Sequence, residues 1–532
     1  MNIKEYLKEN LIYLDGGMGT MLQANGLTAG ELPERWNISH PEIITRIHRD
    51  YFDAGSHVVN ANTFGANILN FSAEELEKII CAAIKNARDA AEQSSGKQPK
   101  WVALDIGPTG KILKPFGDLD FEDAVAAFAE TVKLGVTYGA DLIVIETMSD
   151  SYETKAALLA AKENSELPVF VSNAYGTGGK IMTGADPAAM VAMLEGMGAD
   201  AIGVNCSLGP KALFGVIEEY LKYASVPVLL KPNAGLPKTI DGKTVYDILP
   251  NEFSREVAEL VRRGVRIIGG CCGTTPEYIS ETVKIVKNIP PVCIETKEFT
   301  CVSSRTHAVI LDTEPILIGE KINPAVNDLV EEALLDTDMD SIVDWGMEQQ
   351  EEGVHILSVA VGLPEIDETK TLADVVCEIQ TMIDLPLLLN TSNITAMERA
   401  LRRYNGKAMI YSANGKKESM DAVFPIVKKY GGLVIALTID KNERPTTAEK
   451  AFAIAERILV EAKKHGLDKK DIIFDPIPLA LNAENTAVTE TLRAVEMIKK
   501  ELGCHVALGI SDATFPIAER DATACTFSLC LG

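Results

Sequence analysis

Three cysteines are the residues of this sequence whose type and spacing most readily support chemistry. Cys206 lies in the run GVNCS, and Cys271 and Cys272 lie side by side in GGCCGTT. Adjacent cysteines on a regular strand would point to opposite faces, but the glycines around this pair would let the backbone turn, so that both sulfur atoms converge. Three thiolates with one vacant position describe a catalytic zinc site rather than a closed structural one. The alternative is two buried cysteines and an unrelated third, because free cysteines are commonly buried.

The elements that would position these cysteines form a repeated strand-then-helix pattern. Each short run is apolar at its start and polar or glycine-rich at its end, which is typical of a buried parallel strand that emerges into a functional loop. In the first half the runs are 12–19, 57–65, 101–110, 141–148, 168–175, 201–207, 227–235 and 265–273. Helix start signals lie between them, such as Ser39 with Pro41 and Asp120 with Glu122. Eight such units predict a (β/α)8 barrel over residues 1–290, with the cysteines on its C-terminal face, where active sites occur.

The same pattern restarts after a segment without helical periodicity. Residues 291–314 are predicted to be a linker with room for a short hairpin, and residues 315–532 a second barrel. Its strands are expected at 315–323, 355–362, 386–393, 408–415, 433–440, 471–478 and 505–512. One of its helices should begin with a capping box of Thr446 and Glu449. Only 20 residues follow Asp512, so we expect this barrel to stop before an eighth strand and helix complete it. The predicted fold class is α/β, with two TIM-type barrels in tandem.

Composition and charge narrow the classes of function. The chain has 532 residues, of which 46% are hydrophobic, and a net charge of −25. Such a chain repels phosphate backbones and anionic lipids, so we expect no nucleic-acid partner and no membrane partner. No segment has the roughly 18 uncharged apolar residues of a membrane span, and the N-terminal segment carries charges where a signal peptide needs an apolar stretch. The ten cysteines show no secreted-scaffold pattern, which predicts reduced thiols and a cytoplasmic location.

Several motifs together resemble a known family. The runs LDGGMGT, NANTFGAN, DIGPTG, IETMSD, GVNCS and GGCCGTTPEY, in this order over residues 1–290, are similar to those of homocysteine S-methyltransferases. With GEKINP (319–324) and GLPEID (362–367), the whole chain resembles the N-terminal half of the cobalamin-dependent methionine synthases. In that family a homocysteine-binding barrel is followed by a methyltetrahydrofolate-binding barrel. The resemblance therefore implies a methyltransferase that makes methionine from homocysteine.

The resemblance also implies a zinc ion, held by Cys206, Cys271 and Cys272. A free thiol with a pKa near 8.5 is mostly protonated at neutral pH, whereas a thiol bound to zinc is ionised. Three cysteinates carry one more negative charge than the ion balances, which should keep a bound substrate sulfur electron-rich. A zinc-activated homocysteine thiolate is thus expected to attack the methyl donor.

The amino-acid end of homocysteine needs partners of its own. Glu146 is the leading candidate to accept its ammonium group and Asp15 the second, although either could instead be a helix cap or a salt-bridge partner. Backbone N–H groups around Gly17, in GGMGT, could bind the carboxylate. Asn62 and Asn205 are expected to orient loops or ligands at the site.

The second barrel keeps part of a pterin-binding pattern. The candidate pterin-binding residues are Glu320, Asn323, Asn390, Asp475 and Asp512. The family usually presents an aspartate and an asparagine where this chain has Ser358 and Ala360, an aspartate at Asn390, and asparagines at Tyr411 and Asp512. Each unpaired polar group of a buried pterin costs about 1–3 kcal/mol. We therefore expect impaired binding of methyltetrahydrofolate, the alternative being that other residues retain it.

These patterns do not identify the methyl donor. No Asp-x-His-x-x-Gly signature of a cobalamin-binding module occurs in the chain. Cobalamin would therefore be carried by a separate module or another protein, which would then be a partner. Three hypotheses follow: the homocysteine and folate half of a methionine synthase, a homocysteine methyltransferase that uses a non-folate donor and keeps its second barrel as a scaffold, and a non-catalytic zinc- or thiol-binding module.

Overall fold

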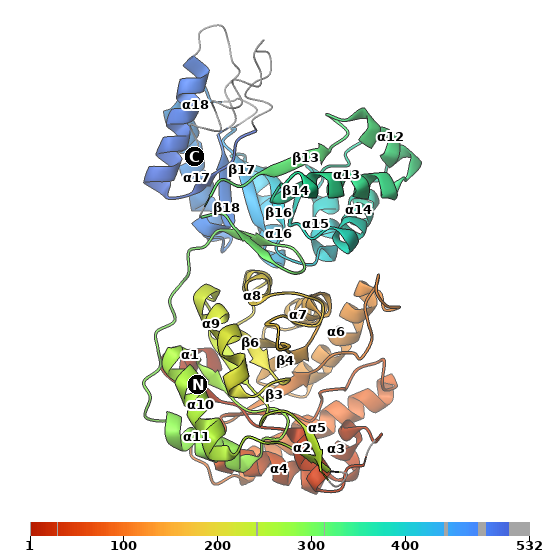
Figure 1. Ribbon diagram of the computed structural model, residues 1–532, viewed down its shortest axis with the longest axis vertical. Coiled ribbons are helices and arrows are strands. Elements are labelled where there is room, and N and C mark those ends of the chain that lie inside the picture. Colours follow the sequence, from red (N-terminus) through yellow and green to blue (C-terminus); the bar gives the residue numbers. More distant parts are fainter. Residues whose placement is uncertain are drawn as a thin grey trace. The chain divides into compact units, whose positions relative to one another are not determined.

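The computed structural model describes residues 2–28, 30–240, 243–312, 314–440, 445–476 and 486–509. The chain divides into two units, residues 1–297 and residues 298–532 (Figure 1). Each unit is built on a parallel sheet with helices between successive strands, and together they are two TIM-type barrels in tandem. The predicted α/β fold class is confirmed.

Eight parallel strands form the barrel of the first unit, and each falls within a run predicted from the sequence. They are β1 (Ile12–Tyr13), β2 (Val58–Asn60), β3 (Trp101–Ile106), β4 (Leu142–Met148), β5 (Val169–Asn173), β6 (Ala201–Asn205), β7 (Val228–Lys231) and β10 (Ile267–Ile268). Their order in the sheet is β1-β10-β7-β6-β5-β4-β3-β2. The N–H of His57, just before β2, donates to the carbonyl oxygen of Tyr13 in β1 at 2.7 Å, which brings the two ends of the sheet together.

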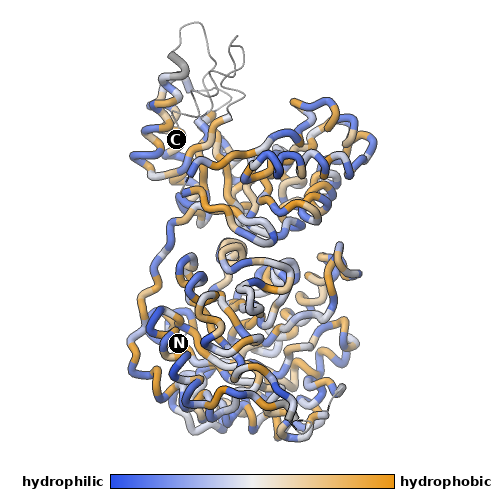
Figure 2. Tube along the Cα trace, in the orientation of Figure 1, coloured by the Kyte–Doolittle hydropathy of each residue, from blue (hydrophilic) through white to orange (hydrophobic). Residues whose placement is uncertain are grey.

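Helices follow the strands of this barrel. The principal ones are α4 (Pro41–Ala54), α5 (Ala73–Gln93), α6 (Phe121–Thr137), α7 (Ser151–Asn164), α8 (Pro187–Gly196), α9 (Phe214–Tyr223), α10 (Pro250–Arg263) and α11 (Pro276–Val286). Hydropathy alternates along many of them, as expected for helices with one face against a sheet (Figure 2). Asp120 caps α6 as predicted. The predicted cap at Ser39 is wrong: α4 does begin at Pro41, but Ser39 ends the preceding helix α3 (Trp36–Ser39), and its hydroxyl donates to the carbonyl oxygen of Arg35.

The N-terminal end of the first barrel is closed by helix α1 (Ile3–Glu9). Its Ile3 and Leu7 are buried in the same apolar cluster as the inward side chains of the strands. The guanidinium of buried Arg266 donates to the carbonyl oxygens of Leu7, Lys8 and Asn10, which the end of the helix leaves without intrahelical partners. This helix therefore forms a floor under the barrel.

Seven parallel strands form the sheet of the second unit, and all seven lie within predicted runs. They are β13 (Ile318–Ile322), β14 (Ile356–Val359), β15 (Leu387–Asn390), β16 (Met409–Asn414), β17 (Leu433–Leu437), β18 (Ile472–Asp475) and β19 (His505–Val506), paired in sequence order. The helices are α12 (Asp328–Asp336), α13 (Met339–Glu351), α14 (Glu368–Met382), α15 (Ile394–Arg403), α16 (Lys417–Tyr430), α17 (Ala448–Lys464) and α18 (Thr486–Met497). The predicted stop before an eighth strand concerns residues 510–532, which lie outside the described residues.

The predicted capping box of α17 is wrong by one residue. Thr447, not Thr446, is the N-cap, and its hydroxyl accepts a hydrogen bond from the N–H of Lys450. The hydroxyl of Thr446 instead lies 3.3 Å from the Nζ of Lys450. Two neighbouring threonines make this choice hard to predict, because both are good caps.

A hairpin of β11 (Cys301–Ser303) and β12 (Ala308–Ile310) forms the floor of the second barrel. Val302 is fully buried in an apolar cluster with residues from the beginnings of the strands, such as Ile356, Met409 and Leu433. The hydroxyl of Tyr404 donates to the carbonyl oxygen of Ser303 at 2.7 Å. The segment predicted as a linker therefore contains a hairpin that packs as part of the second unit.

The loop after β7 carries a small antiparallel hairpin, β8 (Lys238–Ile240) with β9 (Lys243–Val245), which the sequence patterns did not indicate. Among the described residues, no helix is long and apolar enough to cross a membrane.

Candidate functional site

A layer of polar side chains lies above the apolar floor of the first barrel. Side chains two positions apart on a strand point to the same face. The inward apolar residues Val58, Ala103, Val144 and Leu229 are followed two positions later by polar residues of β2, β3, β4 and β7. These four polar residues are Asn60, Asp105, Glu146 and Lys231, all of them buried. The barrel interior is thus apolar near the N-terminal ends of its strands and charged near their C-terminal ends.

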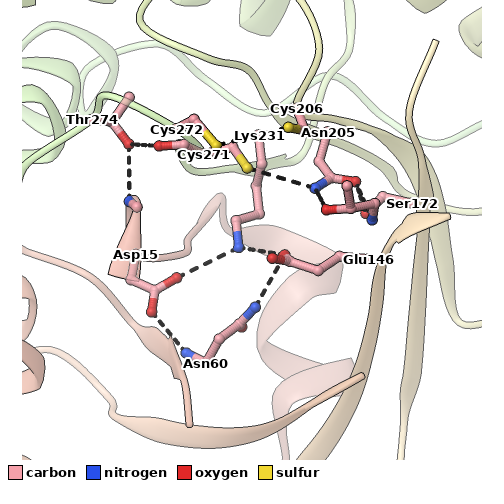
Figure 3. Close-up of polar contacts among 12 residues, drawn as sticks. Asp15, Asn60, Glu146, Ser172, Asn205, Cys206, Lys231, Cys271, Cys272 and Thr274 are labelled. Carbon is pink, nitrogen blue, oxygen red and sulfur yellow. Dashed lines mark hydrogen bonds and ion pairs between the residues drawn. The ribbon is translucent and has the colours of Figure 1, made fainter. Parts of the chain in front are cut away.

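The three predicted cysteines meet at this C-terminal end. Their sulfur atoms lie within 4.8 Å of one another, and those of Cys206 and Cys272 are 3.9 Å apart (Figure 3). Cys206 follows β6 in the left-handed region, with φ at 62°, and its N–H donates to the carbonyl oxygen of Lys231. The turn after Cys272 uses the positive φ of Gly273, 81°, so glycine there permits the approach that the sequence indicated.

The charge state of this cluster favours a bound cation. The thiols of Cys271 and Cys272 hydrogen-bond to the sulfur of Cys206, which lowers the pKa of Cys206 and raises the pKa values of Cys271 and Cys272. The three sulfur atoms alone therefore accommodate one negative charge. All three become ionised only beside a positive charge, and a set of three sulfur ligands suits zinc. The residues present fit the implied metal.

Asn205 is committed to the protein rather than open to a ligand. Its Oδ1 accepts hydrogen bonds from the N–H of Thr147 at 2.7 Å and from the hydroxyl of Ser172 at 2.9 Å. Its Nδ2 lies 2.7 Å from the hydroxyl oxygen of Thr147 and 3.9 Å from the sulfur of Cys271. Thr147 has a left-handed φ of 61°, so Asn205 holds the backbone directly after Glu146 in a conformation that non-glycine residues rarely adopt. Asn205 therefore fixes the C-terminal end of β4 rather than a loop.

The two predicted carboxylates surround a buried lysine. The Nζ of Lys231 lies 2.6 Å from Oε2 of Glu146 and 3.6 Å from Oδ1 of Asp15 (Figure 3). The Nδ2 of Asn60 also donates to Glu146, at 3.1 Å, and the N–H of Asn60 donates to Asp15 at 2.8 Å. Burial raises the pKa of Asp15 to about 6, an effect that Lys231 partly offsets. Burial alone would lower the pKa of Lys231, but Glu146 and Asp15 outweigh it, so this pKa is raised and the lysine is charged. Lys231 is a site residue that the sequence motifs did not indicate, although its strand position matches that of Glu146.

Three buried oxygen atoms of this cluster have no hydrogen-bond donor in the part of the chain that the structure describes. They are Oδ1 of Asp15, Oδ1 of Asn60 and Oδ1 of Asp105. A buried acceptor without a donor is costly, and an ammonium group carries three donors. The arrangement thus combines a sulfur cluster with nearby oxygen atoms that lack a hydrogen bond, of which Oδ1 of Asp15 has an ion-pair partner in Lys231.

Two predicted substrate residues have other partners. The N–H of Gly17 donates to the carbonyl and hydroxyl oxygens of Thr274, so it is not available for a carboxylate. A Cβ atom at Gly17 would lie 2.7 Å from the carbonyl oxygen of Cys271, which shows that close packing requires glycine there. The Nδ2 of Asn62 donates to the carbonyl oxygen of Pro33 and to Asn37, and this fixes the loop after β2.

The predicted pterin-binding residues that the structure describes lie in or after three different strands of the second barrel, β13, β15 and β18. Asp475 is buried at the end of β18, and Asn390 ends β15 directly beside Tyr411 of β16. Asn323 follows β13, and its side chain accepts from the N–H of Ala325, while Glu320 is exposed. The structure places these residues in or after the strands of one sheet, and Asp512 lies outside the described residues.

Comparison with known proteins identifies the family of the first barrel. The sequence model of the homocysteine S-methyltransferase family matches residues 12–286, just over half of the chain. The chain belongs to the homocysteine S-methyltransferase family. It is therefore a methyltransferase, and the family resemblance seen in its sequence is confirmed. The model of pterin-binding enzymes matches residues 319–529, which agrees with the pattern seen in the second barrel.

The similarity of this homocysteine S-methyltransferase family member to two curated relatives covers both barrels. The methionine synthase of Mycobacterium tuberculosis (strain ATCC 25618 / H37Rv) is 28% identical over 544 residues, which cover 97% of this chain and 46% of that protein. The methionine synthase of Mycobacterium leprae (strain TN) is 29% identical over 552 residues, or 97% of this chain and 45% of that one. The chain thus spans about half the length of these relatives. Among solved structures, the oxidized homocysteine methyltransferase MmuM of Escherichia coli matches with 22% identity and a TM-score of 0.45, over 52% of this chain and 96% of that one.

Proposed function

We propose that the first barrel methylates homocysteine on sulfur to give methionine, with a zinc ion bound by Cys206, Cys271 and Cys272. The observation that carries the proposal is the convergence of these three sulfur atoms beside buried acidic groups. Family membership supports homocysteine as the methyl acceptor, and the mycobacterial relatives, which are methionine synthases, support methionine as the product.

The chain's own residues bind and orient the substrate. When bound, zinc supplies the Lewis acidity that keeps a substrate thiol ionised at neutral pH. The carboxylates of Asp15 and Glu146 accept hydrogen bonds from the ammonium group of the substrate. Asn60 holds both carboxylates in place through its own hydrogen bonds to them. Asn205 fixes the end of β4 through Thr147 and approaches Cys271. The position of the sulfur is thus set by the cysteines and that of the amino group by the acidic cluster.

Substituting Glu146 with glutamine should weaken homocysteine binding by about 1.5–3 kcal/mol, because a charge-assisted hydrogen bond to the ammonium is lost. Zinc should stay bound, since Glu146 provides no ligand. Calorimetry with homocysteine measures the effect, and 4-mercaptobutanoate, which lacks the amino group, is the matched control ligand. Its affinity should change little. An unchanged affinity for homocysteine would assign Glu146 the purely structural salt-bridge role.

We propose that the methyl group comes from a corrinoid carried by another module or protein. Several side chains on the loops after β2, β3 and β5 are exposed and apolar, on the side of the barrel where the cysteines lie. They are Phe64, Ile68, Leu69, Ile112, Phe116 and Met182. Such a surface suits a large apolar partner. The test is methionine formation from homocysteine with methylcobalamin, with methyltetrahydrofolate plus cobalamin, or with S-methylmethionine as donor. If no donor gives methionine, the remaining hypothesis is a non-catalytic zinc- or thiol-binding module.

The second barrel favours a donor other than folate. Ser358 is buried in β14, the apolar Ala360 directly follows that strand, and Tyr411 stands directly beside Asn390. These side chains offer fewer acceptors to a pterin than carboxylates and amides would. This observation supports a homocysteine methyltransferase whose second barrel is a scaffold. We further propose a cytoplasmic location, on the cysteine usage of the sequence.

Methyltetrahydrofolate is therefore expected to bind the full chain weakly or not at all. Equilibrium dialysis measures this directly. Asn390→Asp, which restores one carboxylate without a change of side-chain size, should recover part of the affinity, and the melting temperature should confirm that the variant is folded. Micromolar binding by the unaltered chain would contradict the prediction and would favour a barrel that uses folate.

A further inference from the structure

Asp105 is a buried carboxylate for which the proposed reaction has so far no use. It lies in β3, two positions after the inward-facing Ala103, and is 6% exposed. Its backbone N–H and carbonyl oxygen are both hydrogen-bonded to the hydroxyl of Thr63, so the backbone is fixed on both sides. Its side-chain Oδ1 has no donor within the described residues. The carboxyl group is therefore held inside the barrel with unused acceptor capacity.

The charged groups that face Asp105 come from four other elements. They are Asp15 after β1, Glu34 of the 3-10 helix Pro33–Arg35, Glu146 of β4 and Lys231 of β7. Only Lys231 is positive, and its 2.6 Å contact is with Glu146. Burial and the nearby Glu146 raise the pKa of Asp105 well above its usual value, more than Lys231 lowers it. One lysine thus does not balance all of these carboxylates.

We propose that Asp105 is protonated while the substrate site is empty and ionises when the ammonium group of the substrate binds. This inference rests on the proposed function, because it takes an amino-acid thiol as the substrate. The O–H bond of the Asp105 carboxyl breaks, its proton passes to solvent, and the carboxylate becomes the third acceptor for the ammonium, with Asp15 and Glu146. The arriving positive charge takes the place of the departing proton, so the net charge of the buried cluster is preserved.

The mechanism makes the ammonium group a condition for proton release. A thiol without an amino group cannot replace the proton, so it leaves Asp105 protonated. Because binding of the amino acid releases a proton, the affinity for homocysteine should rise with pH between the pKa of Asp105 in the occupied site and its higher pKa in the empty site. Asp105 would therefore be a specificity-determining residue for amino-acid thiols.

The experiment compares proton release by two ligands of the zinc-loaded full chain. Homocysteine and 4-mercaptobutanoate are titrated by calorimetry near pH 7 in buffers of different ionisation enthalpy. Ionisation of the thiol contributes equally to the proton release of both ligands. The difference between the two values therefore reports only the effect of the amino group. Homocysteine is expected to release about one proton more than the analogue, and Asp105→Asn should abolish this difference.

The control variant is Glu153→Gln, which alters another buried carboxylate of the same barrel. Burial raises the pKa of Glu153 as well, but its partner is Thr109 rather than a group of the cluster around Asp105. The substitution should therefore leave the difference in proton release unchanged. Equal proton release by the two ligands in the unaltered chain would overturn the inference, as would a difference that survives in Asp105→Asn. Both results differ from failure of the proposed function, in which zinc-loaded protein would bind neither thiol.

Discussion

Cys272→Ala is expected to release the zinc ion and to lower the rate of methionine formation by about a thousandfold or more. The metal contributes several kcal/mol to activation of the thiol, and each 1.36 kcal/mol corresponds to a tenfold change in rate. The three sulfur atoms lie within 4.8 Å of one another, so removal of one leaves only two sulfur ligands for the zinc ion. Metal analysis of the purified protein, with a methyl-transfer assay, measures both effects.

The matched control is Cys293→Ala, since Cys293 is an exposed cysteine outside the cluster. This variant should keep one zinc ion per chain and full activity. Carefully reduced wild-type protein without zinc would contradict the proposed site. So would a Cys272→Ala variant with undiminished zinc content.

Lys231→Met is expected to destabilise the first barrel by about 3–5 kcal/mol at pH 8, because removing one partner of a buried ion pair leaves the other charge uncompensated. Lys231 is 2% exposed and is the positive group between Glu146 and Asp15. Methionine has a similar length, so the change removes mainly the charge. Hydrogen exchange of peptides from β4 and β7 reports the local free energy of opening.

The pH dependence separates this charge effect from a packing effect. In the variant, the pKa of Asp15 should rise above its value of about 6, further above that of the unfolded chain. A carboxyl group whose pKa is raised in the folded state costs stability as pH rises, and the cost disappears once the group is protonated. The deficit should therefore be smaller at pH 5 than at pH 8. A deficit that is independent of pH would indicate lost packing, and exposed Lys238, paired with Asp247, provides the control Lys238→Met, with an expected change below about 1 kcal/mol.

The strands and the cysteine cluster could be predicted because both depend on local signals. Apolar runs that end in polar or glycine-rich segments gave fifteen strands at the right places, and the glycines beside Cys271 and Cys272 indicated the turn that brings the sulfur atoms together. Lys231 and Asp105 could not be predicted as site residues from their motifs, because the motifs alone do not show which face of the strand each side chain occupies. Counting two positions from the apolar layer would have placed both beside Glu146.

Other features depend on partners far away in the sequence. The N–H of Gly17 is bound by Thr274, and the amide of Asn62 by Pro33 and Asn37, so neither group is open to a substrate. Nothing in GGMGT or NANTFG reveals these partners. The same holds for the hairpin of β11 and β12, whose burial depends on the strands of the barrel that follows it.

The floors of the two barrels have a consequence for dividing or recombining such chains. In each unit the floor is the segment directly before the first strand, α1 before β1 and the β11–β12 hairpin before β13. A fragment beginning at residue 315 would lose Val302 and expose the apolar ends of the strands that surround it, whereas one beginning at residue 298 would keep them covered. The joint for exchanging one barrel between homologous chains should therefore lie before the floor segment, so that each barrel is transferred together with the segment that closes its base.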